Sequence, residues 1–381
     1  MHISICSLAT LSALGNNDDS IWKNYCQAKP LFTVSKNQQL ISELTSDDKL
    51  QIKRLKNSTK KYKQLDKTVL YGIYVARKAL IQCQWQTADI GINMSSSRGA
   101  TELFEKYYDS YVKKKKISSL SSPTTTLGNI SSWLAHDLGT TGLNIEHSIT
   151  CSSAFAAIAN ACAWLQSGLC DKFMVGASEA PLTDFTVAQM QALGIYAEDK
   201  FDNFPCHALD INKTQNSMIL AEAAGVACLE KGKNPQALAV ISGIGYATEA
   251  LIHNTSLSAD AQCMQKSMLM AIGNKKLDMI DIIITHTPGT ILGDKAEIKA
   301  INVVFNNKPP ALTCNKWQIG HSLAASGMLS LQMALFMLNK QKFIATPFYK
   351  SHNTPKKINN ILINSVGFGG NAVSLLISKN K

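Results

Sequence analysis

The stretch ITCSSAFAAIANA, residues 149–161, decides the fold of this chain. Upstream of its turn, Leu143, Ile145 and Ile149 occupy alternate positions, as the buried residues of a β-strand do. Downstream, the small residues after Cys151 predict a helix that packs closely against its surroundings. The chain therefore passes from strand to helix at a cysteine.

Cys151 has two competing interpretations at this point. A helix that starts at the cysteine points its N–H groups and the positive end of its dipole at the thiol, which lowers the thiol pKa below its free value of roughly 8.5. Such a thiolate is a nucleophile. Free cysteine is also among the most buried residue types, so for Cys151 taken alone an inert buried thiol is the more ordinary interpretation.

Predicted strands and helices alternate along the chain, which is typical of an α/β fold with largely parallel sheets. Apolar or alternating segments predict strands over residues 3–6, 90–94, 143–149, 239–244, 280–285, 311–314, 361–365 and a last strand ending at 377. Besides the helix after Cys151, helices are predicted over residues 21–27, 63–82, 129–137, 259–272 and 322–338.

The layout around Cys151 recurs in the second half of the chain. The strand predicted over 311–314 leads through a sharp turn to His321 and a helix of small residues, which indicates an internally duplicated fold. Between the two parts, the segment KGKNP (231–235) is typical of a turn. We therefore predict two halves, residues 1–233 carrying Cys151 and residues 234–381 carrying the two candidate histidines described below.

The composition describes an ordinary soluble globular chain with a large core. Of the 381 residues, 45% are hydrophobic and 17% are charged. Ten cysteines are scattered without a Cys-x-x-Cys pair, and no secretory leader opens the sequence, which favours reduced thiols and a cytoplasmic protein. Residues 317–339 are nearly uncharged, but their histidine and polar side chains predict a buried helix and no membrane span.

The formal charge of +11 predicts attraction to an acidic partner. The surplus of lysine and arginine is concentrated in the basic segments 53–56, 60–63 and 113–116. Each segment is ordinarily a solvated helix face or loop, and the alternative is docking of an acidic protein or a phosphorylated substrate. Few aromatic residues are interleaved with the lysines, so we predict no nucleic-acid partner.

His286 and His321 both follow predicted strands, as Cys151 does. Each histidine alone is more often structural than catalytic. In open α/β sheets, however, ligands usually bind at strand ends, so two histidines and a cysteine at equivalent strand ends can converge on one pocket. A metal site would need a further ligand, and we predict no metal.

Five further segments extend this pattern. They are TCSS (150–153), HTPGT (286–290), GDKAE (293–297), GHSLAASG (320–327) and GFGGN (367–371). Together with Lys316, five residues before His321, they resemble the motifs of the condensing enzymes of the thiolase-like fold, specifically the elongating β-ketoacyl-acyl-carrier-protein synthases. The resemblance runs from Ile3 to Ile377. It implies two pseudo-symmetric halves in a layered α-β-α-β-α architecture.

The resemblance implies a decarboxylative Claisen condensation in two half-reactions. Cys151 accepts an acyl group from a thioester, and His286 and His321, both neutral, donate N–H groups to the enolate left when malonyl carrier protein loses carbon dioxide. The backbone N–H groups of Cys151 and Phe368 hold the tetrahedral oxyanion. Lys316 disfavours a charged imidazolium by its own positive charge, and its competing role is a plain salt bridge.

The same resemblance implies softer assignments around these residues. Thr290 hydrogen-bonds the pantetheine arm, Phe368 also gates acyl entry, and Gly369 contributes to substrate binding. Asp294 and Glu297 are structural acids that order the loop of His286. No cofactor is implied, because the substrates arrive on the phosphopantetheine of an acyl carrier protein. A homodimer, or a heterodimer with a ketosynthase-like subunit, is implied as the assembly.

Three departures from the family pattern indicate a specialised synthase. Thr287 and Pro288 stand where a glycine and then a threonine are usual, so one pantetheine-binding hydroxyl is displaced or missing. Ser330 stands where many relatives carry glutamate, and the segment CHALD (206–210) with QNS (215–217) replaces a usual arginine- and glycine-containing stretch. We therefore expect a pigment or polyketide pathway, such as that of aryl polyenes or flexirubin-like compounds.

Other functions remain open on the same scaffold. A non-catalytic chain-length-factor subunit shapes the acyl tunnel of a heterodimer, but Cys151, His286 and His321 are all retained. A thiolase or starter-type synthase uses cysteine or asparagine in place of one histidine. An acyltransferase would load Cys151 and pass the acyl group to a hydroxyl or amine.

Overall fold

Two five-stranded sheets form the frame of the computed structural model, which describes residues 2–86, 89–198, 202–250, 257–351 and 354–380. The first sheet runs in the order β1 (Ile3–Leu11), β7 (Ala223–Lys231), β6 (Lys172–Glu179), β4 (Gly91–Ser95), β5 (Asn144–His147). The second runs β8 (Ala239–Thr248), β12 (Asn371–Ser378), β11 (Asn360–Gly367), β9 (Ile282–Ile284), β10 (Ala311–Thr313).

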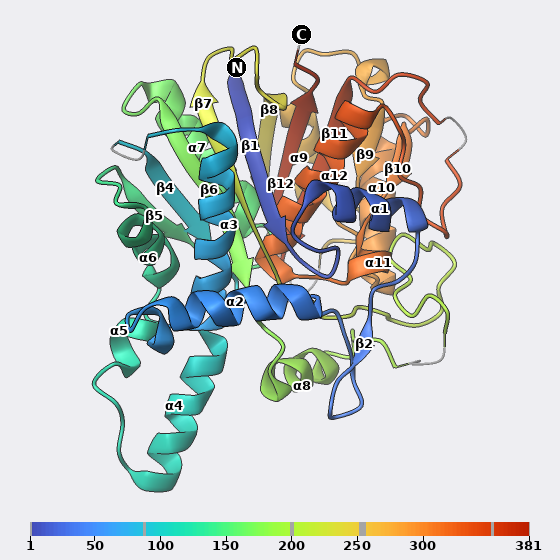
Figure 1. The fold of residues 1–381 in the computed structure, drawn as a ribbon. Helices are drawn as coiled ribbons and strands as arrows, with labels where there is room; N and C mark the ends of the chain where they lie inside the picture. The colour runs from blue at the N-terminus through green and yellow to red at the C-terminus, as the bar shows by residue number, and fades with distance from the viewer. Residues whose placement is uncertain (1, 87–88, 199–201, 251–256, 352–353, 381) are drawn as a thin grey trace.

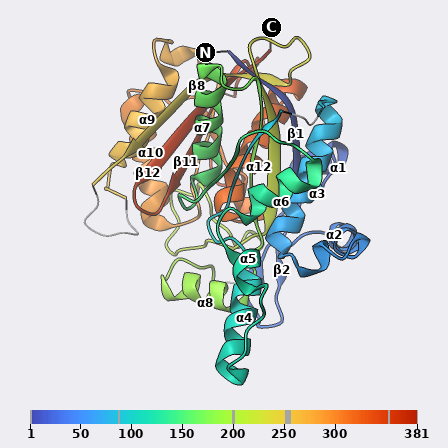
Figure 2. The same cartoon turned by 90° about the vertical axis from the view of Figure 1, so that its left-hand side faces the viewer.

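Helices fill the space between the sheets and cover both outer faces (Figures 1 and 2). Between the sheets lie α7 (Ser153–Ser167) and α12 (Ser326–Lys340), in one core cluster with strands of both sheets. The first sheet is covered by α3 (Lys67–Cys83) and α6 (Asn129–Leu138), the second by α9 (Gln262–Ile272) and α10 (Ile291–Val304). This layering confirms the predicted α-β-α-β-α architecture.

The two halves repeat one topology. Strands β1, β7, β6, β4 and β5 correspond in order to β8, β12, β11, β9 and β10, and every corresponding pair of neighbours has the same direction. The duplication inferred from the two strand–turn–helix layouts is therefore present in the whole fold. The chain crosses from the first copy to the second between the end of β7 and the start of β8.

The prediction of largely parallel sheets is wrong for half of the strand pairs in the two five-stranded sheets. β4 runs parallel to β5 and β6, and β9 to β10 and β11, but β7 and β12 are antiparallel to both of their neighbours. The connection of β11 to β12 spans only residues 368–370, which makes a hairpin and is too short for the crossover that parallel strands require.

Several elements differ from their predicted extents or were missed. The helix predicted from residue 63 begins at Lys67, because Asp66 caps it by accepting a hydrogen bond from the Thr68 N–H. The helix predicted over 322–338 begins with a 3-10 turn over 323–325. Missed elements include the central strands β6 and β7, which are buried almost throughout and so show no alternation.

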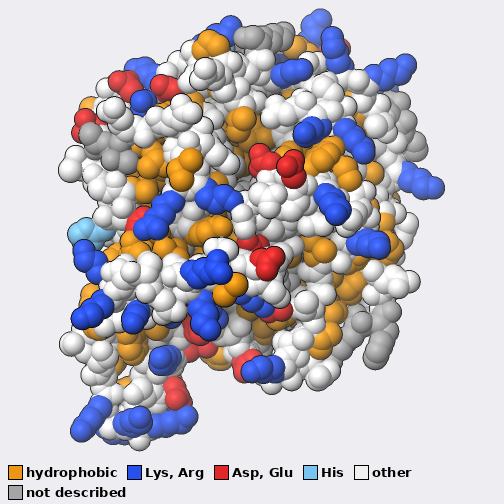
Figure 3. Space-filling model, in the orientation of Figure 1, with side chains coloured by type: hydrophobic (Ala, Val, Ile, Leu, Met, Phe, Trp, Pro, Cys, Tyr) orange, Lys and Arg blue, Asp and Glu red, His pale blue; other side chains and the backbone are white. Residues whose placement is uncertain are grey.

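The remaining elements lie around this frame. They are α1 (Asp18–Gln27), β2 (Thr33–Val34), β3 (Leu40–Ile41), α2 (Ser46–Ser58), α4 (Thr101–Lys114), α5 (Ser121–Thr125), α8 (Asp184–Ala192), α11 (Lys316–Ile319) and 3-10 turns at 62–64 and 277–279. Helix α4 projects from the body (Figure 1), and lysines crowd its tip (Figure 3). Across the described ranges, no helix is both long and apolar enough to cross a membrane. The nearly uncharged segment 317–339 instead forms α11 and the interior helix α12.

Candidate active site

Cys151 lies on a sharp turn between β5 and α7 and is buried. Thr150, directly before it, has a φ of 49°, a left-handed conformation that is costly for a β-branched residue. The Ser153 hydroxyl holds this turn by donating to the Thr150 carbonyl (2.6 Å) while accepting from the Ile149 N–H (2.7 Å). Helix α7 itself begins two residues after the cysteine, at Ser153.

The two halves of the chain bring both histidines to this thiol. His321 Nε2 lies 3.2 Å from Cys151 Sγ, and the rings of His286 and His321 meet edge to face with centroids 5.2 Å apart. The backbone of His321 is anchored on both sides, because its N–H donates to Ile219 (2.7 Å) and its carbonyl accepts from Ala221 (3.1 Å). The convergence expected from three strand ends is therefore observed.

Glu297 organises the loop of His286 from within α10. Its carboxylate accepts the backbone N–H groups of His286 (2.9 Å) and Thr287 (2.8 Å) and the side-chain amide of Asn364 (3.1 Å). Burial, opposed by these hydrogen bonds, raises the pKa of Glu297 to about 6. The hydroxyl of Thr287 is paired with that of Thr285 (2.6 Å), so this loop threonine is engaged within the protein.

Asp294 forms a buried ion pair that sequence reasoning missed. Its carboxylate lies 2.6 Å from Lys213 Nζ and accepts the N–H groups of Leu209 (3.0 Å) and Gly289 (3.1 Å). Lys213 also donates to the carbonyl of Asp210 (2.8 Å). The unusual segment 206–217 is thereby tied to the helix that follows His286. The sequence does show a lysine inside this segment, which could have indicated an ion pair. Its partner Asp294 is 81 residues away, so the pair could not be identified from the sequence.

Lys316 is buried at the start of α11 and acts on the site through its charge. Within the described residues it forms no salt bridge shorter than 4 Å. Burial and then the charge of Lys316 lower the pKa of His321 to about 3, and the same two causes hold the pKa of His286 well below its ordinary value. Both imidazoles are therefore neutral at physiological pH.

The expectation that helix α7 lowers the pKa of Cys151 is wrong for this structure. Burial, followed by the charge of Glu179, raises the pKa of the thiol to about 12 and outweighs the opposing effects of Lys316 and the backbone N–H. Desolvation exceeds the helix contribution because the sulfur lies inside the protein. Cys151 is thus a protonated thiol whose sulfur lies 3.2 Å from a neutral imidazole.

Glu179 is a second acid that the sequence did not reveal. It lies fully buried at the end of β6, where its carboxylate accepts from the Ser96 hydroxyl (3.0 Å), the Ala324 N–H (3.3 Å) and the Ser97 N–H. Burial raises the pKa of Glu179 to about 7. Glu179 ends a strand, as the residues before Cys151 do, and this position could have indicated a residue of the site.

The end of β11 and the loop after it close the site beside Cys151. The Ser365 hydroxyl donates to the Cys151 carbonyl (3.1 Å), and the Thr150 hydroxyl donates to the Phe368 carbonyl (3.4 Å). The Phe368 side chain is 39% exposed at the surface, and Gly369 has a φ of +89°. Thr290, half-buried, is the N-cap residue of α10.

A small apolar cluster packs with Cys151 and includes Leu220, whose backbone is paired with that of His321. Its other buried members are Ile41, Val187, Met190, Tyr196, Met218, Leu220 and Leu323. They come from segments far apart in the sequence, so no local pattern could have identified them. The cluster gives the thiol an apolar surface on which a hydrocarbon chain can pack.

Comparison with known proteins agrees with this geometry. Residues 1–234 match the family model for the β-ketoacyl synthase N-terminal domain, and residues 238–349 match that for the C-terminal domain. The 3-oxoacyl-[acyl-carrier-protein] synthase 2 of Staphylococcus aureus (strain MRSA252) is 24% identical, over 100% of this chain and 98% of the relative.

Two solved structures show the same fold at low sequence identity. The ishigamide ketosynthase/chain length factor superposes with a TM-score of 0.86 at 16% identity, covering 100% of this chain and 99% of that one. A type II PKS acyl-carrier protein in complex with its ketosynthase bound to the hexaketide gives a TM-score of 0.84 at 18% identity, covering 99% of each chain. The chain belongs to the β-ketoacyl synthase family of condensing enzymes.

Proposed function

We propose that this chain is a catalytically active β-ketoacyl-acyl-carrier-protein synthase that joins an acyl thioester to malonyl carrier protein with loss of carbon dioxide. The observation that carries the proposal is the contact of His321 Nε2 with Cys151 Sγ at 3.2 Å, beside a second neutral histidine. A thiol, an adjacent base and a second N–H donor in one buried site suit both half-reactions.

In the first half-reaction, Cys151 attacks the thioester carbonyl of an acyl carrier protein. His321 takes the thiol proton as the carbon–sulfur bond forms, and the departing carrier sulfur takes up a proton, which returns the imidazole to neutral. The N–H groups of Cys151 and Phe368 stabilise the tetrahedral oxyanion before the carrier thiol leaves. The product is an acyl group bound to Cys151.

In the second half-reaction, malonyl carrier protein loses carbon dioxide and its bonding electrons form an enolate. His286 and His321 donate N–H groups to the enolate oxygen. The carbanion attacks the acyl carbonyl on Cys151, a carbon–carbon bond forms, and the cysteine sulfur leaves as a thiolate that takes up a proton from solvent. Because Lys316 disfavours an imidazolium, the histidines do not quench the carbanion with a proton.

The proposed substrates are carried on the phosphopantetheine of an acyl carrier protein, with Thr290, Phe368 and Gly369 lining the entry. No further cofactor takes part in the proposed steps. The relative from Staphylococcus aureus is named for carrier-protein substrates, and the hexaketide-bound ketosynthase is in complex with its carrier protein. The surplus of lysines suits an acidic carrier. We propose a homodimer or a heterodimer with a ketosynthase-like subunit as the working assembly.

The departures from the family pattern support a specialised pathway. In place of an arginine-containing stretch, the segment 206–217 uses Lys213 to pair with Asp294, and buried Ser330 stands at a common glutamate position. We propose pigment or polyketide synthesis, of the aryl polyene or flexirubin-like kind, in preference to housekeeping elongation.

The test is to incubate the protein with acyl and malonyl carrier proteins and to measure carbon dioxide and product. The proposal expects a β-ketoacyl product two carbons longer, and none from Cys151→Ala. A chain-length-factor role would give neither an acyl group on Cys151 nor carbon dioxide. An acyltransferase would load Cys151 but transfer the acyl group to a hydroxyl or amine without releasing carbon dioxide. Either result would overturn the proposal.

A further inference from the structure

Three cysteines gather on the outer face of the first sheet, away from the candidate active site. Cys83 ends α3, Cys228 lies on β7, and Cys6 lies in the irregular part of β1, all within or against the same core cluster. The sequence analysis assigned these thiols no role. Their positions follow from strand register and helix period.

Strand pairing places Cys228 directly beneath the end of α3. Ser7 of β1 is the registered neighbour of Cys228 on β7, and the Ser7 hydroxyl donates to the Ala79 carbonyl of α3 (2.7 Å). Cys83 follows Ala79 by four residues, so it lies on the same face of the helix. Cys228 accordingly lies in the core cluster between the first sheet and α3, and Cys83 packs against that same cluster.

The surroundings of Cys83 favour its thiolate. The neighbouring Cys228 thiol, as the largest cause, and the Trp85 N–H lower the pKa of Cys83 to about 7 against the effect of burial. The carbonyl end of α3 works in the opposite direction. Cys83 is also partly exposed, whereas Cys228 is buried, so a solvent oxidant reaches Cys83 first.

We propose that Cys83 and Cys228 form a reversible disulfide when the protein meets hydrogen peroxide. The Cys83 thiolate attacks one peroxide oxygen, the O–O bond breaks, and a hydroxide leaves as water, which gives a sulfenic acid. The Cys228 sulfur then attacks the Cys83 sulfur, the S–O bond breaks, and a second water leaves. Two thiols lose two electrons in total, and the peroxide gains them.

Cys151 is not the preferred target of this oxidation. Its thiol is buried and its pKa is raised to about 12, so little thiolate is present. Cys6 is engaged differently, because its thiol lies 3.3 Å from a Glu230 carboxylate oxygen and its pKa is raised to about 12. The disulfide would join the end of α3 to β7 and would protect Cys83 from irreversible oxidation.

The experiment treats the full chain carrying Cys151→Ala with hydrogen peroxide, blocks free thiols with iodoacetamide, and maps linked peptides by mass spectrometry without reduction. A Cys83–Cys228 peptide that disappears after reduction is expected. Cys83→Ser must abolish it, while Cys26→Ser, at an exposed thiol, must leave it intact. Because Cys151 is absent, the result is independent of the proposed function.

Two outcomes would overturn the proposal. One is a sulfinic acid at Cys83 while Cys228 stays reduced, and the other is a link between Cys83 and Cys6. A second experiment measures the rate at which iodoacetamide alkylates Cys83 in the unoxidised protein at a series of pH values. Half-maximal rate near pH 7 is expected, whereas a midpoint at or above the free-cysteine value of roughly 8.5 would show that Cys83 is not activated.

Discussion

At Gly367, its last residue, β11 passes directly over the turn that carries Cys151. A Cβ added there would clash with the Thr150 hydroxyl oxygen and lie 3.1 Å from the Cys151 backbone nitrogen. We expect Gly367→Ala to displace the turn and lower the rate of Cys151 acylation by about 100-fold, the size typical of a small misplacement of reacting groups. Stopped-flow or mass-spectrometric acylation measures this rate.

The control for Gly367→Ala removes the Thr150 hydroxyl, which the added methyl group would otherwise strike. Thr150→Ala takes away the hydroxyl, so Gly367→Ala with Thr150→Ala should acylate faster than Gly367→Ala alone. If the double variant is no faster, the close approach of these two residues does not explain the need for glycine.

Lys316 offers a second test at the scale of one side chain. Removing its charge in Lys316→Met leaves burial as the main influence on both histidines, so their pKa values rise. A larger fraction of imidazolium then forms at mildly acidic pH, and the acid limb of carbon dioxide release should move to higher pH. The measurement is the pH–rate profile with malonyl carrier protein.

Lys316→Arg is the matched variant, because it keeps the positive charge. Its acid limb should stay near that of the unsubstituted protein even if its rate is lower. An unchanged acid limb in Lys316→Met would show that the charge does not set the protonation of the histidines.

At the scale of elements, the Lys213–Asp294 pair joins the segment 206–217 to α10. Both side chains are buried, so Lys213→Met leaves an uncompensated carboxylate inside the protein. Losing one partner of a buried ion pair typically costs about 3–5 kcal/mol in the free energy of unfolding. Chemical denaturation followed by circular dichroism measures this loss.

A double-mutant cycle separates the lost pair from lost packing. Asp294→Asn removes the charge that Lys213→Met leaves behind, so the double variant should be more stable than Lys213→Met alone. Additive losses from the two substitutions would indicate that the pair is not coupled.

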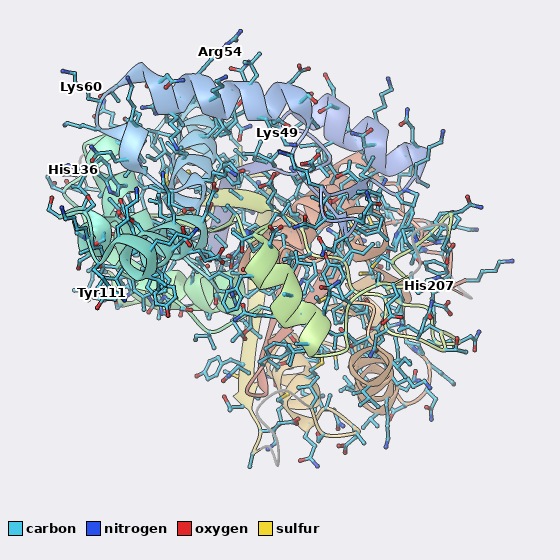
Figure 4. All side chains as sticks on the ribbon, turned by 90° about the horizontal axis from the view of Figure 1, so that it is seen from below. Lys49, Arg54, Lys60, Tyr111, His136 and His207 are labelled. Atoms are coloured by element: carbon cyan, nitrogen blue, oxygen red, sulfur yellow. The ribbon has the colours of Figure 1, made fainter. Side chains whose placement is uncertain are left out.

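His207 lies in the same segment, on the opposite side of the molecule from α4 and α6 (Figure 4). Burial opposes its charged form, but hydrogen bonds to Asp210 (2.9 Å) and Asp202 (2.7 Å) outweigh it and raise its pKa. A raised folded-state pKa stabilises the protein below the unfolded value of about 6.5, and this stability is lost as pH rises through the folded pKa.

We therefore expect His207→Gln to flatten the loss of stability between mildly acidic and mildly alkaline pH. Unfolding curves at several pH values, compared with the unsubstituted protein, measure the difference. Equal pH dependence in both proteins would remove His207 as its source. Its ring also stacks on Phe348 with centroids 4.7 Å apart, so a pH-independent loss from packing is expected in addition.

The sequence predicted those elements in which apolar residues alternate regularly or form a run that polar residues clearly end. Strands β4, β5, β9 and β10 were predicted because each is a short apolar or alternating run followed by polar residues. Helix α10 was missed, because the segment that contains the GDKAE motif was considered for its site residues and no helix was predicted there. The buried acid and lysine of the site, Glu179 and Lys213, escaped because their partners lie far away in sequence.

At the scale of the whole molecule, duplication explains why the site could be located. Each half presents a strand, a turn and an interior helix to the shared middle layer, with Cys151 before α7 and His321 before α12. The two copies face each other across that layer, so equivalent turns meet. Duplication does not predict the pKa of the Cys151 thiol. That pKa depends on burial, and the thiol is buried only when both halves are assembled around it.

The net charge of +11 belongs to the molecule as a whole and predicts how it meets a carrier protein. Basic side chains such as Arg54 and Lys60 point outward along α2 and the residues after it (Figure 4), and a further group surrounds the tip of α4 (Figure 3). Attraction between exposed charges is screened within about 8 Å at physiological salt and about 3 Å at 1 M. We expect the affinity for an acidic malonyl carrier protein to fall steadily as salt rises.

Charge-removing variants locate the surface responsible. We compare the loss of affinity when glutamine replaces Lys53, Arg54 and Lys56 on α2 with the loss when it replaces Lys60, Lys61 and Lys63, because each set removes three charges. A third variant neutralises Lys113–Lys116 at the tip of α4. The set that docks the carrier should weaken binding and flatten its salt dependence, while the others leave both nearly unchanged. Affinity that does not depend on salt in the unsubstituted protein would exclude electrostatic docking, and apolar contacts around the site entrance would then have to bind the carrier.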